Sequence, residues 1–304
     1  MAVDWKGVFP ALMTEFAEDG ALDLDATAAH IEVELAAGIH GLVMLGTLGE
    51  NVSLSPGEKR DVVRCAVETV AGRVPVLSGV SEYTTPGAVD YVRDIAKIGA
   101  DGAMVLPPMV YRTDPRETVA HFRTVAATSD LPLMVYNNPV TYGTDVTPEM
   151  FAGLADAEAL VAIKESSDDV RRLTDLHNAT GDRYVLFCGV DDIVLESLVL
   201  GASGWVAGLV NAFPAESVRL YELVVAGRLD EARDLYRWFM PMLHLDCHAK
   251  LVQYIKLANS MAGTGAEWVR PPRLRLVGEE RARIAAIVQT AIDNRPSLAA
   301  LAAE

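Results

Sequence analysis

Residues 159–169 read Ala-Leu-Val-Ala-Ile-Lys-Glu-Ser-Ser-Asp-Asp. The first five residues form an apolar run that is long enough for one buried strand. The chain becomes polar immediately afterwards, beginning at Lys164. A near-continuous apolar strand is typical of a parallel sheet that is covered on both faces. A polar residue at its carboxyl end stands where such sheets carry their functional sites.

Similar apolar runs recur along the chain and alternate with helical patterns, and none of them alternates regularly between polar and apolar residues. They predict eight parallel strands separated by helices. The predicted strands are Val8–Thr14, Gly41–Gly46, Val74–Gly79, Gly102–Leu106, Leu131–Tyr136, Leu160–Lys164, Tyr184–Gly189 and Gly204–Gly208.

A weak internal repeat supports this interpretation. The pattern Gly-x-x-Gly followed by an apolar strand begins at Gly38, Gly99 and Gly201. The first glycine can end a helix in the left-handed conformation, and the second allows the next strand to start close by. The eight predicted strands, alternating with helices, predict a (β/α)8 TIM barrel. A doubly wound open sheet is the alternative, but no GxGxxG turn follows the first strand.

The last third of the chain is predicted to be helical. Pro214–Ala226 can serve as the eighth barrel helix, which gives a barrel over residues 1–226. The later helical patterns, Leu229–Leu243, Ala249–Met261 and Glu279–Asp293, predict a C-terminal helical extension over residues 227–304 that packs on the barrel.

Composition narrows the class of protein. The chain has 304 residues, 51% hydrophobic residues and a formal net charge of −16, which argues against nucleic acid and anionic membranes as partners. Glycines interrupt the uncharged stretch 197–215, which favours a buried strand over a membrane span. Cys65, Cys188 and Cys247 are far apart, as expected of reduced thiols in a cytoplasmic protein without a signal peptide.

The predicted strand ends carry an amine, tyrosines, hydroxyls and glycine-rich turns, but no His/Cys cluster. His177, His244 and His248 lie away from these ends and are interpreted as surface or packing residues. Asp191 and Asp192 are interpreted as caps of the following helix. We therefore predict neither a metal nor a cofactor.

Three strand-end residues suggest a chemistry when they are taken together. Burial lowers the pKa of a lysine, so Lys164 could form a Schiff base with a carbonyl or imine carbon. Tyr136 ends the neighbouring strand and could transfer protons, with Thr47 supplying a hydroxyl relay. The turn Gly46–Glu50 offers N–H groups to a carboxylate. Individually these residues could be a solvent-reaching lysine, a core tyrosine and a tight turn; together they predict a site for a 2-oxo acid.

Three motifs carry a resemblance to a known family. Gly46-Thr47-Leu48-Gly49-Glu50, Tyr136-Asn137-Asn138-Pro139 and Ile163-Lys164-Glu165 occur in the order found in the dihydrodipicolinate synthase/N-acetylneuraminate lyase family. The resemblance implies a TIM barrel with a helical extension, a homotetramer, and metal-free Schiff-base catalysis by Lys164, Tyr136 and Thr47. The predicted substrate-binding residues are Gly46, Leu48, Tyr111, Asn138, Thr141, Ser166, Gly189 and Val206.

The sequence departs from dihydrodipicolinate synthases at three positions. Leu48 replaces the second threonine of the first motif, Thr141 stands where an arginine holds the second substrate's carboxylate, and Val110 stands at the relay tyrosine, with Tyr111 one position later. The motifs resemble more closely the subgroup of 1-pyrroline-4-hydroxy-2-carboxylate deaminases. We expect an enzyme that converts this cyclic imino acid to 2-oxoglutarate semialdehyde and ammonia.

Other functions are compatible with the same residues. A retro-aldolase acting on a 2-oxo-3-deoxy sugar acid would use the same lysine and release pyruvate. Dihydrodipicolinate synthase is a second alternative within the family. A non-catalytic barrel that binds a small molecule is the alternative outside enzymes, and it would tolerate the replacement of Lys164 by arginine.

Overall fold

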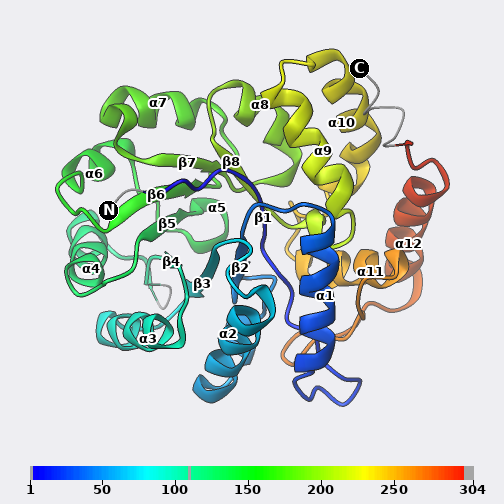
Figure 1. The fold of residues 1–304 in the computed structure, drawn as a ribbon, viewed down its shortest axis with the longest axis horizontal. Coiled ribbons are helices and arrows are strands. Elements are labelled where there is room, and N and C mark those ends of the chain that lie inside the picture. The colour runs from blue at the N-terminus through cyan, green and yellow to red at the C-terminus, as the bar shows by residue number, and fades with distance from the viewer. Residues whose placement is uncertain (1–2, 109–110, 298–304) are drawn as a thin grey trace.

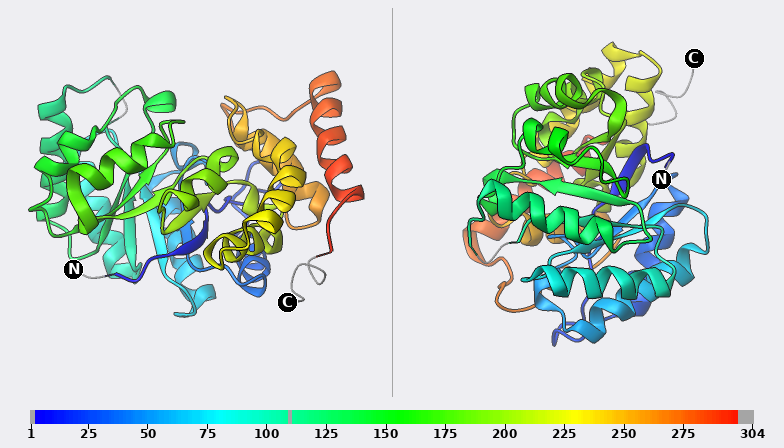
Figure 2. Two further views of the ribbon diagram at one scale, coloured as in Figure 1. Left: turned by 90° about the horizontal axis from the view of Figure 1, so that it is seen from above. Right: turned by 90° about the vertical axis from the view of Figure 1, so that its left-hand side faces the viewer.

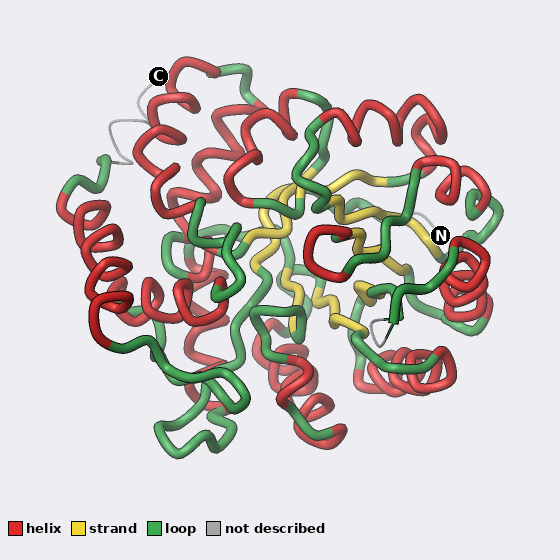
Figure 3. Tube along the Cα trace, turned by 180° about the vertical axis from the view of Figure 1, so that it is seen from behind, coloured by secondary structure: helices red, strands yellow, loops and turns green. Residues whose placement is uncertain are grey.

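The strands of the computed structural model, which describes residues 3–108 and 111–297, form a barrel surrounded by helices (Figures 1 and 3). All neighbouring strands pair in parallel, in the order β1-β8-β7-β6-β5-β4-β3-β2. A parallel bridge between Ala11 and Val43 joins β1 to β2 and closes the ring. The predicted TIM barrel is confirmed. The strands are β1 Gly7–Pro10, β2 Leu42–Met44, β3 Val76–Val80, β4 Gly102–Val105, β5 Leu133–Asn137, β6 Leu160–Glu165, β7 Val185–Cys188 and β8 Gly204–Ala207.

Several of the helices around the barrel start with recognisable capping signals. Ser55 and Glu58 form a capping box at the start of α2, and Asp114 and Glu117 form another at α4. The helices around the barrel are α1 Leu24–Ala36, α2 Pro56–Val70, α3 Thr85–Ile98, α4 Pro115–Ala127, α5 Pro139–Tyr142, α6 Pro148–Gly153, α7 Arg171–Thr180, α8 Val194–Val199 and α9 Pro214–Val225.

The Gly-x-x-Gly repeat acts as the sequence predicts. The first glycine of each repeat has a left-handed φ, for example +104° at Gly99 after α3. The second glycine is needed because packing is close: a Cβ atom would lie 2.3 Å from the ring of Phe9 at Gly41 and 2.4 Å from the ring of Phe187 at Gly204. The first predicted strand was too long: β1 ends at Pro10, and one further bridge, at Ala11, is the last pairing with a neighbouring strand.

Three further helices follow α9 and lie at one side of the barrel (Figure 2). They are α10 Leu229–Leu243, α11 Leu251–Ala262 and α12 Gly278–Asp293. The start of α11 and the turn before it reach the carboxyl ends of the strands. Within the described residues, no helix combines the length and the hydropathy needed to cross a bilayer.

A buried lysine ties these C-terminal helices to the barrel loops. Lys256 of α11 is fully buried, and its Nζ lies 2.9 Å from a carboxylate oxygen of Glu50, in the turn after β2. The same amine donates to the carbonyl oxygens of Thr14, at 2.8 Å, and Trp268, at 2.6 Å. One cation therefore joins the loops after β1 and β2 to the extension.

We expect Lys256→Met to lower the free energy of unfolding by about 3–5 kcal/mol, because the substitution removes the nearer and fully buried cation of the Glu50 carboxylate and leaves Arg273 at 3.7 Å. Urea denaturation would measure the loss. The double variant Lys256→Met/Glu50→Gln is the control and should recover part of the stability. A change in Lys256→Met below about 1 kcal/mol, the range of an exposed ion pair, would contradict this account.

Candidate active site

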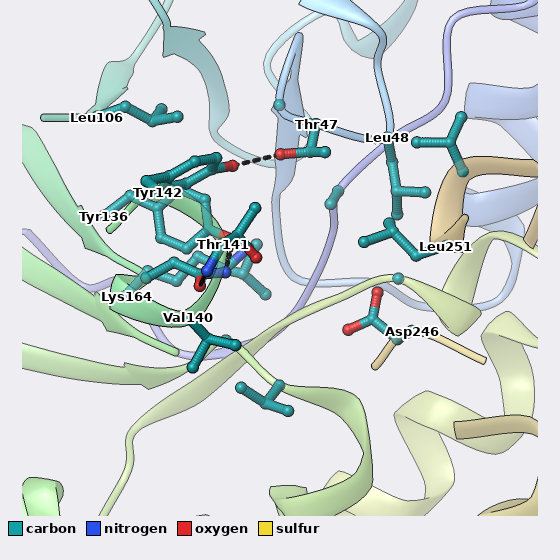
Figure 4. A pocket seen from close by; sticks show the side chains of 18 of the residues that line it. Thr47, Leu48, Leu106, Tyr136, Val140, Thr141, Tyr142, Lys164, Asp246 and Leu251 are labelled. Atoms are coloured by element: carbon teal, nitrogen blue, oxygen red, sulfur yellow. Dashed lines mark hydrogen bonds between the residues drawn. The ribbon is translucent and has the colours of Figure 1, made fainter. Parts of the chain in front are cut away.

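The register between β5 and β6 brings the two central residues of the site together. Tyr136 pairs with Lys164, and Asn137 pairs with Glu165. Lys164 and Tyr136 are each 5% exposed, and Lys164 Nζ lies 4.1 Å from the centroid of the Tyr136 ring. Both line a cavity of about 580 Å³ at the carboxyl ends of the strands (Figure 4).

The surroundings of Lys164 favour a neutral amine. Burial lowers its pKa, while the charges of Asp246, Tyr142 and Asp191 act in the opposite direction. Its side chain passes over Gly189 at the end of β7, where a Cβ atom would lie 2.7 Å from Lys164 Cγ and Cε. The lysine thus reaches the cavity along a path that a larger residue at position 189 would block.

Tyr142 is a site residue that the sequence analysis missed. Its hydroxyl lies 2.5 Å from Thr47 Oγ1, and its ring meets the Tyr136 ring edge-on with the centroids 5.6 Å apart. Tyr136 Oη instead accepts a hydrogen bond from Asn138 Nδ2 at 3.1 Å. The expected contact of Thr47 with Tyr136 is therefore replaced by a contact with Tyr142.

The sequence does carry a signal for this tyrosine. Asn138 is the N-cap of the one-turn helix α5, accepting from Thr141 N at 2.8 Å, and Pro139 stands at the first helical position. A single helical turn after β5 brings Tyr142 back to the cavity at the strand ends (Figure 4). Burial raises the pKa of Tyr142, so its phenol stays protonated.

Beneath the cavity, a hydrogen-bond network joins the ends of β5 and β6. Asn137 Nδ2 donates to Glu165 Oε2 at 3.0 Å and to Asp145 Oδ1 at 3.1 Å, and Arg172 pairs with Asp145 at 2.9 Å. Glu165 Oε1 also accepts from the N–H of Ser167 at 2.8 Å. These bonds fix the backbone immediately after Lys164 and Tyr136.

Most of the predicted substrate-binding residues line the cavity, but two do not. Tyr111 is 58% exposed, because it lies in the loop after β4, and it is not part of the cavity wall. Ser166 is buried against Gly189, where its Oγ fills the space of a Cβ. Val110, the relay-tyrosine position, lies outside the described residues. The predicted residues in the wall are Gly46, Thr47, Leu48, Tyr136, Asn138, Thr141, Lys164, Gly189 and Val206.

Asp191 does not cap the helix that follows it, contrary to the prediction. It accepts hydrogen bonds from Trp205 Nε1 at 3.0 Å, from Gly208 N at 3.0 Å and from Leu209 N at 2.7 Å. The carboxylate therefore caps the helical turn after β8. Its donors are far from Asp191 in the sequence and become its neighbours only when the ring closes.

The C-terminal helices supply a wall of the cavity that the sequence analysis did not foresee. The wall includes Asp246, Cys247 and His248 from the turn between α10 and α11, and Leu251, the first residue of α11. His248 stacks on Tyr254, with the ring centroids 4.7 Å apart. No group of three or more His, Cys, Asp or Glu side chains among the described residues could hold a metal ion.

Comparison with known proteins agrees with this architecture. The sequence profile of the Dihydrodipicolinate synthetase family matches residues 4–291. The chain belongs to this family. It is 33% identical over 281 residues to a 4-hydroxy-tetrahydrodipicolinate synthase of Methanothrix thermoacetophila, covering 92% of this chain and 95% of the relative. As a member of the Dihydrodipicolinate synthetase family, the protein is a lyase of the lysine Schiff-base class.

Solved structures of the family superpose closely on the chain. A putative dihydrodipicolinate synthetase from Pseudomonas aeruginosa has a TM-score of 0.90 at 31% identity, covering 95% of this chain and 100% of that one. YagE, a prophage protein of the dihydrodipicolinic acid synthase family from E. coli K12 crystallised with pyruvate, has a TM-score of 0.90 at 28% identity. The superposition covers 95% of this chain and 99% of the YagE chain.

We expect Gly189→Ala to slow the formation of a pyruvate adduct on Lys164 by at least about tenfold, because the new methyl group would displace the lysine side chain. Mass spectrometry after borohydride reduction would measure the adduct. Gly153→Ala is the matched control, since a Cβ atom at that exposed glycine of α6 meets nothing within 4 Å. Equal adduct rates in both variants would contradict the proposed path of the lysine.

Proposed function

We propose that the protein forms a Schiff base between Lys164 and C2 of a small 2-oxo acid or cyclic imino acid, and that its substrate is 1-pyrroline-4-hydroxy-2-carboxylate. The observation that carries the proposal is the position of the buried Lys164 amine, 4.1 Å from the ring of Tyr136 inside a cavity. A neutral lysine next to a phenol provides both the nucleophile and a group that moves protons. The pyruvate complex of the related YagE protein supports a 2-oxo acid as ligand.

The cavity wall supports a compact substrate. Thr47 and the glycine-rich turn line the cavity, and we assign the substrate carboxylate to their hydroxyl and N–H groups. Opposite the lysine, Leu48 presents an apolar side chain that is 3% exposed, and Leu106 and Val206 add further apolar surface. A five-membered ring fits such a wall better than the hydroxylated chain of a sugar acid, whose polar groups would lose their hydrogen bonds.

The proposed reaction begins at C2. The neutral amine of Lys164 attacks this carbon, the bond from C2 to the ring nitrogen breaks, and the nitrogen leaves as an amine, so that an iminium links Lys164 to C2. Tyr136 removes a proton from C3, and the electron pair moves into the iminium to give an enamine. The enamine expels the 4-hydroxyl group, which takes up a proton and leaves as water.

The remaining steps return the enzyme to its starting state. A proton shift moves the unsaturation to C5, which becomes an imine carbon. Two water molecules hydrolyse the C=N bonds at C5 and C2, releasing ammonia, 2-oxoglutarate semialdehyde and the free amine of Lys164. One water is lost and two are consumed, so the net reaction is the addition of one water and the loss of ammonia.

Two other activities of the family and the state of assembly need separate measurements. Retro-aldol cleavage would release pyruvate, which lactate dehydrogenase detects. Dihydrodipicolinate synthesis, the activity named for several relatives, would condense pyruvate with aspartate semialdehyde. We also propose a homotetramer; one solved neighbour is described as a monomeric variant, so light scattering must decide the assembly of this chain.

We expect the purified enzyme to release ammonia from 1-pyrroline-4-hydroxy-2-carboxylate without forming pyruvate, and Lys164→Arg to abolish this activity. Borohydride trapping with pyruvate should label Lys164. The labelling rate should rise with pH and level off below pH 10.4, the pKa of an ordinary lysine, because burial lowers the pKa of Lys164 and favours the reactive neutral amine. Turnover by Lys164→Arg at the wild-type rate would point to another mechanism, whereas a wild-type protein that binds the ligand without turnover would be a binding barrel.

The contact between Tyr142 and Thr47 predicts a proton relay within one chain. Burial raises the pKa of Tyr136, and its hydrogen bonds, including the one with the Tyr142 hydroxyl, act in the opposite direction. The hydroxyl groups of Tyr136, Tyr142 and Thr47 can therefore form a path that carries the C3 proton away. We expect Tyr142→Phe to reduce kcat about 10²-fold, the range of a proton-transfer group, with little change in KM. Tyr184→Phe, which removes a buried phenol outside the cavity, is the matched control; equal effects on kcat would contradict the relay.

A further inference from the structure

Asp246 brings a carboxyl group into the cavity from outside the barrel. It lies in the turn between α10 and α11 and is half-buried in the cavity wall. Its carboxyl group faces the cavity across from Tyr136 and Lys164 (Figure 4). The barrel makes room for it with a glycine, because a Cβ atom at Gly208, after β8, would lie 2.6 Å from Asp246 Oδ1.

The carboxyl groups of Asp246 and its neighbour Asp191 have different hydrogen-bond partners. Asp191 is fully buried, and its oxygens accept from the indole of Trp205 and from the N–H groups of Gly208 and Leu209. Its role is structural. Asp246 accepts a backbone hydrogen bond from Asp191. Within the described part of the chain, no cationic side chain lies at ion-pair distance from it, so an oxygen atom stays available to a ligand.

The groups around Asp246 favour its protonated form. Burial raises its pKa well above the usual range, the negative charges of Asp191 and Asp192 act in the same direction, and Lys164 acts in the opposite one. A carboxyl group that keeps its proton near neutral pH can donate it to a departing oxygen. The titratable groups that face Asp246 are Lys164, Tyr136, Asp191, Asp192 and Cys247.

We propose that Asp246 is the general acid that protonates the 4-hydroxyl group of the substrate as it leaves. The proposal rests on the proposed function, in which Lys164 holds C2 and Tyr136 removes a proton from C3. The C4–O bond then lies two bonds beyond C2, towards the wall that the C-terminal helices supply. As that bond breaks, the oxygen keeps the electron pair and takes the carboxyl proton to become water, and Asp246 becomes a carboxylate that regains a proton from solvent.

Asp246→Asn tests this role because asparagine keeps the shape and loses the acidic proton. We expect kcat for ammonia release to fall by about 10²- to 10⁴-fold, the range of a lost general acid, while the pyruvate adduct on Lys164 forms within about twofold of the wild-type rate. Activity that depends on a protonated carboxyl group declines as pH rises through its pKa. The alkaline limb of the kcat–pH profile should therefore be absent in the variant.

A substrate analogue separates acid catalysis from a merely structural effect. Fluoride needs less protonation than hydroxide to leave, so 4-fluoro-1-pyrroline-2-carboxylate should lose fluoride at similar rates in the wild type and in Asp246→Asn. Asp234→Asn is the matched control, because it makes the same substitution at an exposed carboxylate of α10 that lies outside the cavity and pairs with Arg237 at 3.2 Å. It should release ammonia at close to the wild-type rate.

Three results would overturn the proposal. One is an unchanged kcat in Asp246→Asn. The second is an equal loss of adduct formation and turnover, which would place the effect on the lysine. The third is a fluoro analogue that Asp246→Asn slows, relative to the wild type, as much as it slows the natural substrate. A wild-type enzyme that forms the pyruvate adduct but leaves the pyrroline intact would instead overturn the proposed function on which this step rests.

Discussion

The chemistry of this protein depends on the burial of one amine. Lys164 is 5% exposed at the end of β6, and the loss of water lowers its pKa and favours the nucleophilic form. The barrel has to exclude water from the amine and still leave it accessible to a substrate. Gly189 leaves the path clear, Tyr136 covers one side with its ring, and the network around Glu165 holds the strand ends in register.

The C-terminal helices complete the cavity as well as stabilising the barrel. Lys256 anchors α11 to the turn after β2 through Glu50, and the turn before α11 then reaches the strand ends. Asp246 enters the cavity on this turn. The same helices hold the turn that carries Thr47 and supply one wall of the cavity. The residues that stabilise this part of the fold therefore also shape the substrate site.

The sequence analysis succeeded where local patterns decide the structure. Apolar strands and the Gly-x-x-Gly repeat predicted the barrel, and the strand-end position of Lys164 placed it beside Tyr136. The analysis failed where contacts depend on closure of the ring. Asp191 finds its donors at β8 instead of in its own helix, and Tyr142 takes the contact with Thr47 that was expected of Tyr136.

The sequence by itself determined the fold class and the position of Lys164 at a strand end, because hydrophobic periodicity, glycine positions and the polar end of an apolar strand are local properties. The tertiary structure decided which hydroxyl meets Thr47 and which carboxyl group enters the cavity. Asp246 lies 82 residues beyond Lys164 in the sequence, and only the packing of α10 and α11 against the barrel brings the two to one cavity. The physical reason is that electrostatic effects on a buried amine depend on distance through space, which sequence spacing does not encode.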